Sequence, residues 1–316
     1  MSRKLPQIIV ISGPTACGKS DLALKLAKKF NGEIVSADSR QIYKEMDIGT
    51  AKTYLGQNYQ KTAPGKYTIS DVPHHLLDIV KPNQKFTLAQ FKKQAVKIIE
   101  GILKRGKIPF LVGGTGLYVS AITDNLSIPP ATPDKKMRGK IESEIKDKGL
   151  DHVWKKLLRL DPAAAEIVDQ RNPRRVIRAL EVCLTTGRPF SAQRMKGQPL
   201  FDVLQIGISV PREKLYAKIN RRSDKMMEAG LLTEVKKLAK KYSWELPSMS
   251  GIGYRQFRPY LEKQAGLPEA VEALKRDTRH YAKKQLTWFR RDERIRWVKN
   301  RQEAEILVKK FLRSAD

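Results

Sequence analysis

Cysteine, long apolar runs and internal repeats are scarce or missing in this sequence. Only Cys17 and Cys183 occur among 316 residues, so neither a disulfide framework nor a thiolate metal site is indicated. No apolar run approaches the roughly 20 residues that a membrane helix needs, and residues 1–7 lack the apolar region of a signal peptide. No repeat of fixed period is present, which excludes a solenoid. We therefore expect a cytoplasmic globular protein without a membrane segment.

Acidic residues are also few. Asp and Glu total 33 against 62 Lys and Arg, which gives a formal net charge of +29 at pH 7. Such an excess favours polyanions through long-range attraction and counterion release, so nucleic acid is the expected partner. The alternative is a basic surface that serves only solubility. The hydrophobic fraction of 41% is sufficient for a packed core and argues against disorder.

Short β-branched runs alternate with helical patterns in the first third of the chain. Residues 7–12, 33–36 and 108–112 have the composition of buried parallel strands. Residues 21–30 and 88–103 have the spacing of amphipathic helices. This alternation predicts an α/β fold with a doubly wound parallel sheet, like that of P-loop NTPases.

The middle of the chain has a different pattern. Between residues 125 and 197 we find helix caps and no convincing strand; Asn172 and Pro173 open one helix, which Gly187 ends. Strand character returns at residues 203–209. We therefore expect an α/β core in two parts and an all-helical insertion, at residues 1–123, 200–316 and 124–199 respectively.

A phosphate-binding signature joins the first strand to the first helix. The segment GPTACGKS matches the pattern GxxxxGK[ST] in the required structural context. Backbone amides and the helix N-terminus bind phosphate in such a loop, Lys19 adds a mobile charge, and the Ser20 hydroxyl can hold Mg²⁺. The residues expected to bind phosphate are Gly13, Pro14, Thr15, Ala16, Cys17, Gly18, Lys19 and Ser20.

The chain lacks the acidic strand end that holds Mg²⁺ in most P-loop NTPases. Residues 108–112 end in GGTG at 113–116, and Asp78 is a poor substitute because only two apolar residues precede it. The loop is therefore expected to bind a diphosphate that leaves rather than a triphosphate that is hydrolysed. Asp38 follows the strand at 33–36, at the sheet edge that faces ligands, where it could accept a proton. The alternative is that Asp38 caps a helix.

Several segments together resemble the tRNA dimethylallyltransferase family, also called the tRNA isopentenyltransferase family. The resemblance follows the family's order of motifs over almost the whole chain. A phosphate loop alone occurs in many families, whereas DSRQIY, GGTGLY and SGIGYRQ together are specific. The matching segments are GPTACGKS (13–20), ADSRQIYKEMDIGTAK (37–52), VPHHLLDI (72–79), GGTGLY (113–118), RNPRRVIRALEV (171–182), TGRPFS (186–191), SGIGYRQF (250–257) and KKQLTWFRRD (283–292).

The resemblance implies transfer of a dimethylallyl group from its diphosphate to the exocyclic amine of a tRNA adenine. That adenine lies just 3′ of the anticodon, at position 37, and pyrophosphate is released. By the resemblance, Asp38 is the general base and Thr115 is a hydroxyl beside the reacting groups. Thr15, Lys19 and Arg222 are implied diphosphate contacts, and the phosphate loop with Mg²⁺ would stabilise the departing pyrophosphate.

The resemblance also implies an extended RNA surface. The adenine must leave its stack to reach the core, the insertion would bind the anticodon loop, and the basic C-terminal segment would hold the stem. The expected partners are the anticodon stem-loop of tRNA and dimethylallyl diphosphate, and we expect the chain to be a monomer. The implied RNA contacts are Asp38, Ser39, Arg40, Gln41, Thr115, Arg138, Gln170, Arg171, Asn172, Pro173, Arg174, Gly251, Ile252, Gly253, Tyr254, Arg255, Lys283, Lys284, Gln285, Leu286, Thr287, Trp288, Phe289 and Arg290.

Basic residues recur at helical spacing near the C-terminus. Spacings of three, four and seven would place four of them on one face of a helix, where they could follow RNA phosphates. The alternative is a solvated helix. Trp288 and Phe289 could stack on bases or pack in the core. The four basic residues are Arg276, Arg279, Lys283 and Arg290.

Three other functions share some of these features. A small-molecule or nucleoside kinase has the phosphate loop and an Asp after the second strand, but needs no such positive charge. A prenyltransferase for free adenine nucleotides needs no RNA surface. A non-catalytic RNA-binding protein leaves the phosphate loop unexplained. Asn125 stands where the resembled family commonly has Gly.

Overall fold

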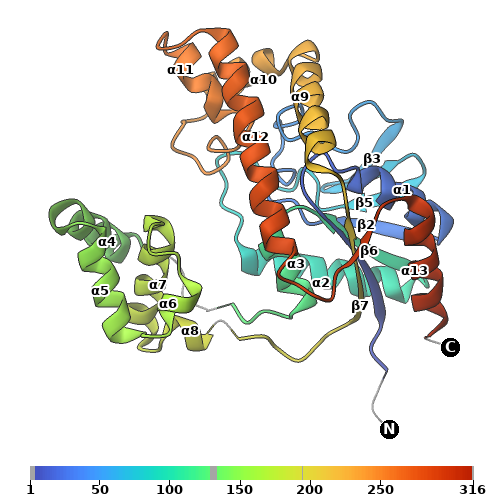
Figure 1. The fold of residues 1–316 in the computed structure, drawn as a ribbon, viewed down its shortest axis with the longest axis horizontal. Helices are drawn as coiled ribbons and strands as arrows, with labels where there is room; N and C mark the ends of the chain where they lie inside the picture. The colour runs from blue at the N-terminus through green and yellow to red at the C-terminus, as the bar shows by residue number, and fades with distance from the viewer. Residues whose placement is uncertain (1–3, 129–133, 194, 315–316) are drawn as a thin grey trace. The chain divides into compact units, whose positions relative to one another are not determined.

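An eight-stranded sheet forms the centre of the larger unit in the computed structural model, which describes residues 4–128, 134–193 and 195–314 (Figure 1). The strand order is β3-β4-β5-β2-β6-β1-β7-β8. Pairs from β5 to β8 are parallel, whereas β4 is antiparallel to both of its neighbours. The strands are β1 (Gln7–Ser12), β2 (Gly32–Ser36), β3 (Tyr59–Ala63), β4 (Lys66–Ile69), β5 (Val72–His75), β6 (Ile108–Gly113), β7 (Asp202–Ile208) and β8 (Arg296–Val298).

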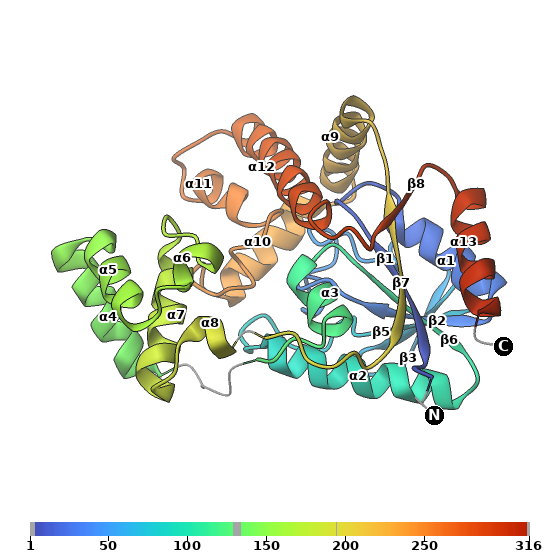
Figure 2. The ribbon, with the colours of Figure 1, turned by 60° about the horizontal axis from the view of Figure 1, so that its bottom comes forward.

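Helices cover both faces of this sheet, as Figure 2 shows. β1 explains why both faces must be covered, since Ile9 and Ile11 pack on one side and Ile8 and Val10 on the other. The first side contacts α1 and α13, and the second contacts α2 and α3. The helices of this unit are α1 (Lys19–Lys29), α2 (Leu88–Lys104), α3 (Gly116–Thr123), α9 (Arg212–Glu228), α10 (Leu231–Lys241), the 3-10 turn η1 (Arg255–Phe257), α11 (Arg258–Leu261), α12 (Leu267–Phe289) and α13 (Arg301–Arg313).

A third apolar cluster joins α9, α10 and α12 to the loop that follows β2. Ile42 and Met46 from that loop pack with Leu231 and Val235 of α10 and with Leu274 of α12. In Figure 1, α12 runs from α11 to the end of α3, so it spans the distance from this cluster to the sheet edge. The loop after β2 is therefore held by a second core, separate from the cores on the sheet.

The second compact unit spans Asp124–Pro199, whereas the first consists of Met1–Thr123 and Leu200–Asp316. In its described residues the second unit contains helices and no strand. Asn125, where glycine is common in the resembled family, has a φ of 44°, a left-handed conformation that Asn adopts more readily than most residues. The helices are α4 (Lys135–Lys148), α5 (Leu150–Leu160), α6 (Ala164–Ile167), α7 (Pro173–Thr186) and α8 (Phe190–Gln193).

The predicted α/β class with a mostly parallel sheet and a helical region is confirmed. The expected strands and helices are present with boundaries shifted by one or two residues. β3, β4 and β5 were not predicted, because β3 is fully exposed and the three strands are only four or five residues long. No helix in the described part of the chain is long and apolar enough to span a bilayer.

Candidate active site

The phosphate loop follows β1 and leads directly into α1. Gly13 has a φ of 148°, which side-chain-bearing residues rarely adopt, and a Cβ there would meet the Cys17 sulfur at 3.0 Å. Lys19 Nζ donates to the carbonyl of Pro14 at 3.1 Å, so the lysine lies over its own loop. The first-turn amides of a helix have no intrahelical acceptor, so those of α1 are available for an anion.

Asp38 lies directly after β2, in a turn and not at the start of a helix. Its Oδ1 accepts from the backbone amides of Arg40 at 2.8 Å and Gln41 at 3.4 Å. The other oxygen, Oδ2, has no donor among the described residues, so one lone-pair face of the carboxylate is available. Asp38 therefore does not cap a helix: one oxygen stabilises a turn, and the other has the position that the general-base prediction requires.

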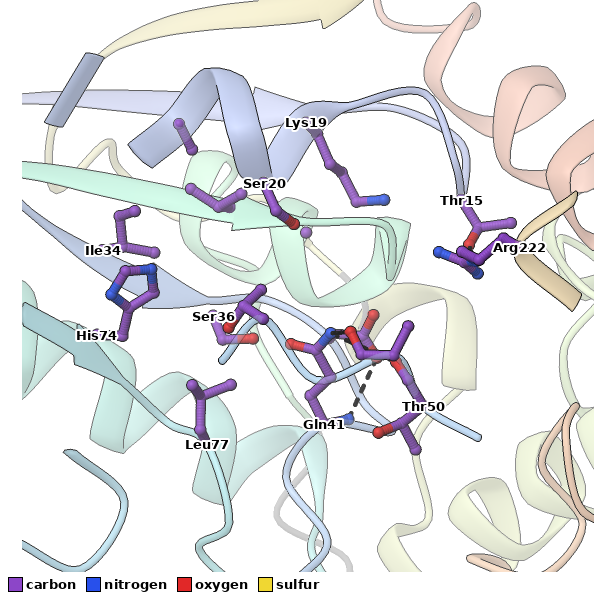
Figure 3. A pocket seen from close by; sticks show the side chains of 16 residues that line it. Thr15, Lys19, Ser20, Ile34, Ser36, Gln41, Thr50, His74, Leu77 and Arg222 are labelled. Atoms are coloured by element: carbon purple, nitrogen blue, oxygen red, sulfur yellow. Dashed lines mark hydrogen bonds between the residues drawn. The ribbon is translucent and has the colours of Figure 1, made fainter. Parts of the chain in front are cut away.

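Two cavities meet at Asp38. The smaller one, of about 70 Å³, is lined by the phosphate loop and by apolar side chains that include Ile34 and Leu77. The larger one, of about 450 Å³, lies beside α9 and α12. Figure 3 shows Lys19 and Ser20 reaching into the smaller cavity, Thr15 next to Arg222, and Gln41 with Thr50 on another wall. Four residues line both cavities, namely Thr15, Asp38, Thr50 and Arg222.

Arg222 and Thr115 make hydrogen bonds to the two loops that carry Thr15 and Asp38. Arg222 Nη2 donates to the Thr15 hydroxyl at 2.6 Å. Burial lowers the pKa of this guanidinium and the Asp38 carboxylate raises it, so the arginine keeps its charge beside the phosphate loop. Thr115 Oγ1 accepts from the Ser39 amide at 3.0 Å and donates to the Ser39 hydroxyl at 3.2 Å. Thr115 thereby supports the turn that carries Asp38.

Two uncharged groups complete the cavities, and the sequence did not identify either as a site residue. His74 lines the smaller cavity; burial lowers its pKa to about 4, and its Nδ1 donates to the Val72 carbonyl at 2.8 Å. Tyr281 of α12 lines the larger cavity; burial and the Asp38 charge raise its pKa to about 12. At neutral pH the histidine adds no charge, and the tyrosine is a hydrogen-bond donor near Asp38.

Glu234 of α10 holds the far end of the Asp38 loop, which we define as residues 37–52. Its carboxylate accepts from the amides of Asp47 and Ile48 at 3.0 and 2.8 Å, and of Gly49 at 3.0 Å. The Tyr254 hydroxyl donates to the same carboxylate at 2.8 Å. Glu234 thus joins the Asp38 loop to the GIGY segment, although about 185 residues separate the partners.

A buried ion pair closes the Asp38 loop. Lys52 Nζ donates to Asp78, to Asp47 at 3.0 Å and to the Tyr43 carbonyl at 2.8 Å. The Tyr67 hydroxyl donates to Asp78 at 2.6 Å. Asp78 is 4% exposed, so its charge is neutralised inside the protein and is not available to a metal.

Half of the implied RNA contacts in the larger unit lie at the surface or in the larger cavity. Ser39, Arg40, Ile252, Arg255 and Lys284 line that cavity. Of the implied contacts near the end of α12, Lys283, Lys284, Thr287 and the C-cap residue Arg290 are exposed. Gly251 and Gly253 are buried glycines beside the Asp38 loop.

The side chains of five implied RNA contacts are packed or hydrogen-bonded inside the protein. Tyr254 and Phe289 are 1% and 2% exposed and pack in the core, so neither can meet a base. Leu286 and Trp288 pack against the two sheet cores. Gln285 is 6% exposed and binds two backbone groups beside the phosphate loop. Sequence reasoning treated residues 283–290 as one surface, whereas a helix buries part of any such run.

Gln41 and Arg279 are also held by the protein. Gln41 is 8% exposed and donates to the Ala51 carbonyl at 3.0 Å, in the wall of the smaller cavity. Arg279 donates to Asn220 of α9 at 2.7 Å, whereas Arg276, Lys283 and Arg290 are exposed. The predicted basic face of α12 therefore consists of three exposed side chains and not four.

In the helical unit, the implied contacts gather at the start of α7. Asn172 is the N-cap, accepting from the Arg175 amide at 3.3 Å, and Pro173 is the first helical residue. Gln170, Arg171, Pro173 and Arg174 are exposed. Arg138 of α4 instead donates to Glu181 at 2.8 Å, a buried carboxylate that also binds Arg178.

The residues of the smaller cavity fit a Mg²⁺ ion that is also bound by substrate phosphates. No group of three or more His, Cys, Asp or Glu side chains within the described ranges could hold a metal. Ser20 and Asp38 do supply hard oxygen ligands to the smaller cavity. Protein Mg²⁺ sites often use one or two such ligands together with substrate phosphates and water, so these residues fit that class.

Comparison with known proteins gives consistent matches over most of the chain. Residues 41–292 match the IPP transferase family, and residues 6–63 match the isopentenyl transferase family. A tRNA dimethylallyltransferase from Carboxydothermus hydrogenoformans is 44% identical, over 100% of this chain and 98% of that protein. Another from Acetivibrio thermocellus is 45% identical over 93% and 92%.

Solved structures are also similar. The tRNA isopentenylpyrophosphate transferase of Bacillus halodurans has a TM-score of 0.68 and 37% identity, over 98% of this chain and 96% of that one. A eukaryotic dimethylallyltransferase acting on tRNA has a TM-score of 0.73 and 30% identity, over 90% and 69% of the two chains. Sequence and structure comparisons therefore agree.

Proposed function

Because this chain belongs to the IPP transferase family, the family of tRNA dimethylallyltransferases, we propose that it transfers a dimethylallyl group to adenine 37 of tRNA. The donor is dimethylallyl diphosphate and the acceptor atom is the exocyclic N6. The observation that carries the proposal is the position of Asp38 at the junction of two cavities, one lined by a phosphate loop.

The smaller cavity matches dimethylallyl diphosphate, because it is polar at one end and apolar on its other walls. Its phosphate-loop end offers Lys19, Ser20 and the amides of α1, and its other walls include Ile34 and Leu77. An isoprenoid diphosphate is charged at one end and apolar at the other, so it fits in this orientation. When bound, Mg²⁺ would be held by Ser20 and the phosphate oxygens and would neutralise charge on the pyrophosphate.

The larger cavity, of about 450 Å³, falls within the range of small-ligand sites and can hold an extruded adenine. In the transfer, the bond between C1 of the donor and its diphosphate oxygen breaks, and pyrophosphate keeps the electron pair. N6 of the adenine bonds to C1, and Asp38 Oδ2 takes the N6 proton. Lys19 and Arg222 stabilise the charge that develops on the pyrophosphate.

The exposed residues at the start of α7 and on α12 supply the remaining RNA contacts. Basic side chains there match the phosphates of an anticodon stem-loop, and the tRNA substrate agrees with the expected cytoplasmic location. Replacing Arg171 and Arg174 with Ala should weaken tRNA binding without weakening binding of dimethylallyl diphosphate. Unchanged tRNA affinity would show that the start of α7 does not contact RNA.

The function is tested by incubating the protein with unmodified tRNA, labelled dimethylallyl diphosphate and Mg²⁺, followed by nucleoside analysis. We expect N6-isopentenyladenosine at position 37 and release of one pyrophosphate per transfer. A parallel reaction with AMP tests the free-nucleotide prenyltransferase, and one with ATP tests the kinase. Comparable labelling of AMP, or ATP turnover without prenylated tRNA, would overturn the proposal.

A further inference from the structure

Gln285 occupies an unusual position on α12. Its neighbours Lys283 and Lys284 are exposed, whereas Gln285 is 6% exposed and faces the sheet edge. A buried primary amide must find partners for both its oxygen and its nitrogen, because a buried polar group without a hydrogen bond destabilises the fold. The partners it finds belong to the candidate active site.

Both ends of the Gln285 amide bind backbone groups from different segments. Oε1 accepts from the Thr15 amide at 2.8 Å, inside the phosphate loop. Nε2 donates to the Gly114 carbonyl at 2.8 Å, in the turn after β6. A Cβ at Gly114 would lie 2.3 Å from Nε2, so glycine is required for the side chain to fit. Gln285 therefore fastens the phosphate loop to the GGTG turn.

Thr15 is restrained twice. Gln285 binds its backbone amide, and Arg222 binds its hydroxyl at 2.6 Å. The Thr15 amide is thus used inside the protein, which leaves phosphate binding to the amides at the start of α1. A flexible glycine-containing loop loses conformational entropy when it orders around an anion, and a loop already fastened loses less.

We propose that Gln285 is a positioning residue that holds the phosphate loop in its diphosphate-binding conformation. The proposal rests on the proposed function only for the identity of the ligand, dimethylallyl diphosphate. It also separates two roles on one helix: exposed cations of α12 face RNA, and the buried amide organises the donor site.

The direct test compares Gln285→Leu with Lys283→Ala, an exposed neighbour proposed to contact RNA. Calorimetry with dimethylallyl diphosphate and Mg²⁺, and separately with tRNA, gives both dissociation constants. For Gln285→Leu we expect about 10- to 100-fold weaker diphosphate binding, because a released loop loses more conformational entropy when it orders around the anion, and tRNA binding within about twofold of wild type. Lys283→Ala should weaken tRNA binding and leave diphosphate binding close to wild type. Weaker tRNA binding with unchanged diphosphate binding in Gln285→Leu would overturn the proposal.

Two further variants address general destabilisation. Ala282→Gly destabilises α12 at a buried position, because glycine forms helices less well than alanine, and it removes no bond to the loop. Its diphosphate affinity should therefore stay close to wild type. An equal loss in Ala282→Gly and Gln285→Leu would mean that helix stability alone is responsible, and would overturn the proposal.

Gln285→Glu keeps the acceptor for Thr15 but replaces the donor to Gly114. A buried carboxyl has a raised pKa, and its protonated form can donate again. Its diphosphate affinity relative to wild type should therefore recover as the pH falls from 8 towards 5. A ratio that does not change with pH would contradict the proposal. These affinities are measured without a transfer reaction. Failure of the nucleoside assay would therefore refute the proposed function, whereas the affinities alone decide the inference about Gln285.

Discussion

The phosphate loop and the Asp38 loop face the same cavity but are built in different ways. The phosphate loop spans residues 13–20 and runs directly into a helix, so its glycines, lysine and serine are neighbours in the sequence, and Gln285 and Arg222 fasten it at Thr15. The Asp38 loop spans residues 37–52 and contains no helix or strand. Two carboxylates from outside the loop hold it, Glu234 through three backbone amides and Asp78 through Lys52. Both loops are held by distant residues, but the phosphate-binding groups of the first are contiguous in the sequence, whereas the second has no helix or strand of its own.

The difference matches the chemistry proposed for each loop. An anion can be bound by any set of amides that converge, and a helix N-terminus provides them locally. A general base must instead be placed against one atom of a large substrate, which requires a support fixed to the rest of the protein. We therefore expect the two loops to respond differently to mutation.

The largest expected effect is at the base itself. Asp38→Asn keeps the shape of the turn, since an amide oxygen can still accept from Arg40, but it cannot take a proton. Single-turnover transfer to tRNA should fall by about 10²- to 10⁴-fold, the usual range for loss of a general base. A loss of only a few-fold would leave Asp38 as a turn-stabilising residue.

A smaller effect is expected at the support. Glu234→Gln replaces one acceptor oxygen with a donor facing backbone amides, so the loop at residues 47–49 should loosen. We expect the transfer rate to fall by about tenfold, because roughly 1–3 kcal/mol of hydrogen bonding is lost, while affinity for dimethylallyl diphosphate stays within about threefold. A variant that remains folded and transfers at the wild-type rate would show that the support is unnecessary.

Glu33→Gln is the matched control for that variant, because Glu33 is a buried carboxylate of β2 outside both loops. Burial raises its pKa, but hydrogen bonds from Arg105 and His75 outweigh that effect and lower it to about 2. The lowered pKa stabilises the fold above pH 4.5, by about 3 kcal/mol, and this stabilisation is lost as the pH falls towards 2. Urea unfolding should show that dependence in wild type and not in Glu33→Gln. Transfer rates at pH 7 should remain close to wild type.

The smallest expected effect on catalysis is at the exposed face of α12. Replacing Arg276, Lys283 and Arg290 with Ala leaves Arg279 in its contact with Asn220. The slope of log affinity for tRNA against log salt should flatten by about two to three units, and saturating tRNA should restore turnover. An unchanged slope would show that this face does not meet RNA.

The sequence predicts the elements whose signals are local. The phosphate loop is recognisable because eight consecutive residues contain its glycines, lysine and serine, and Asp38 because it ends a strand. Glu234 gave no signal, since its partners lie about 185 residues away and an acidic residue on an amphipathic helix is ordinary. Asp78 was considered only as a metal ligand, because its pairing with Lys52 requires the tertiary fold.

Gln285 shows that the composition of a segment does not reveal which of its residues is buried. It lies between basic residues in KKQLTWFRRD, so the composition of the segment favoured an RNA surface for all of it. Which residue of a helix faces inward depends on where the helix packs, and no single sequence states that. The same limit explains Phe289, which belongs to the core beneath α3.

The division of work between the two loops is tested most directly by the affinity of dimethylallyl diphosphate for Asp38→Asn and Lys19→Ala, measured side by side by calorimetry with Mg²⁺. In the proposed function, Lys19 binds the diphosphate from the phosphate loop, whereas Asp38 takes a proton from the other substrate. We predict that Asp38→Asn binds the donor at least as tightly as wild type, and that Lys19→Ala binds it at least about tenfold more weakly, the loss of one charge-assisted hydrogen bond. Equal weakening in both variants, or none in Lys19→Ala, would contradict the account.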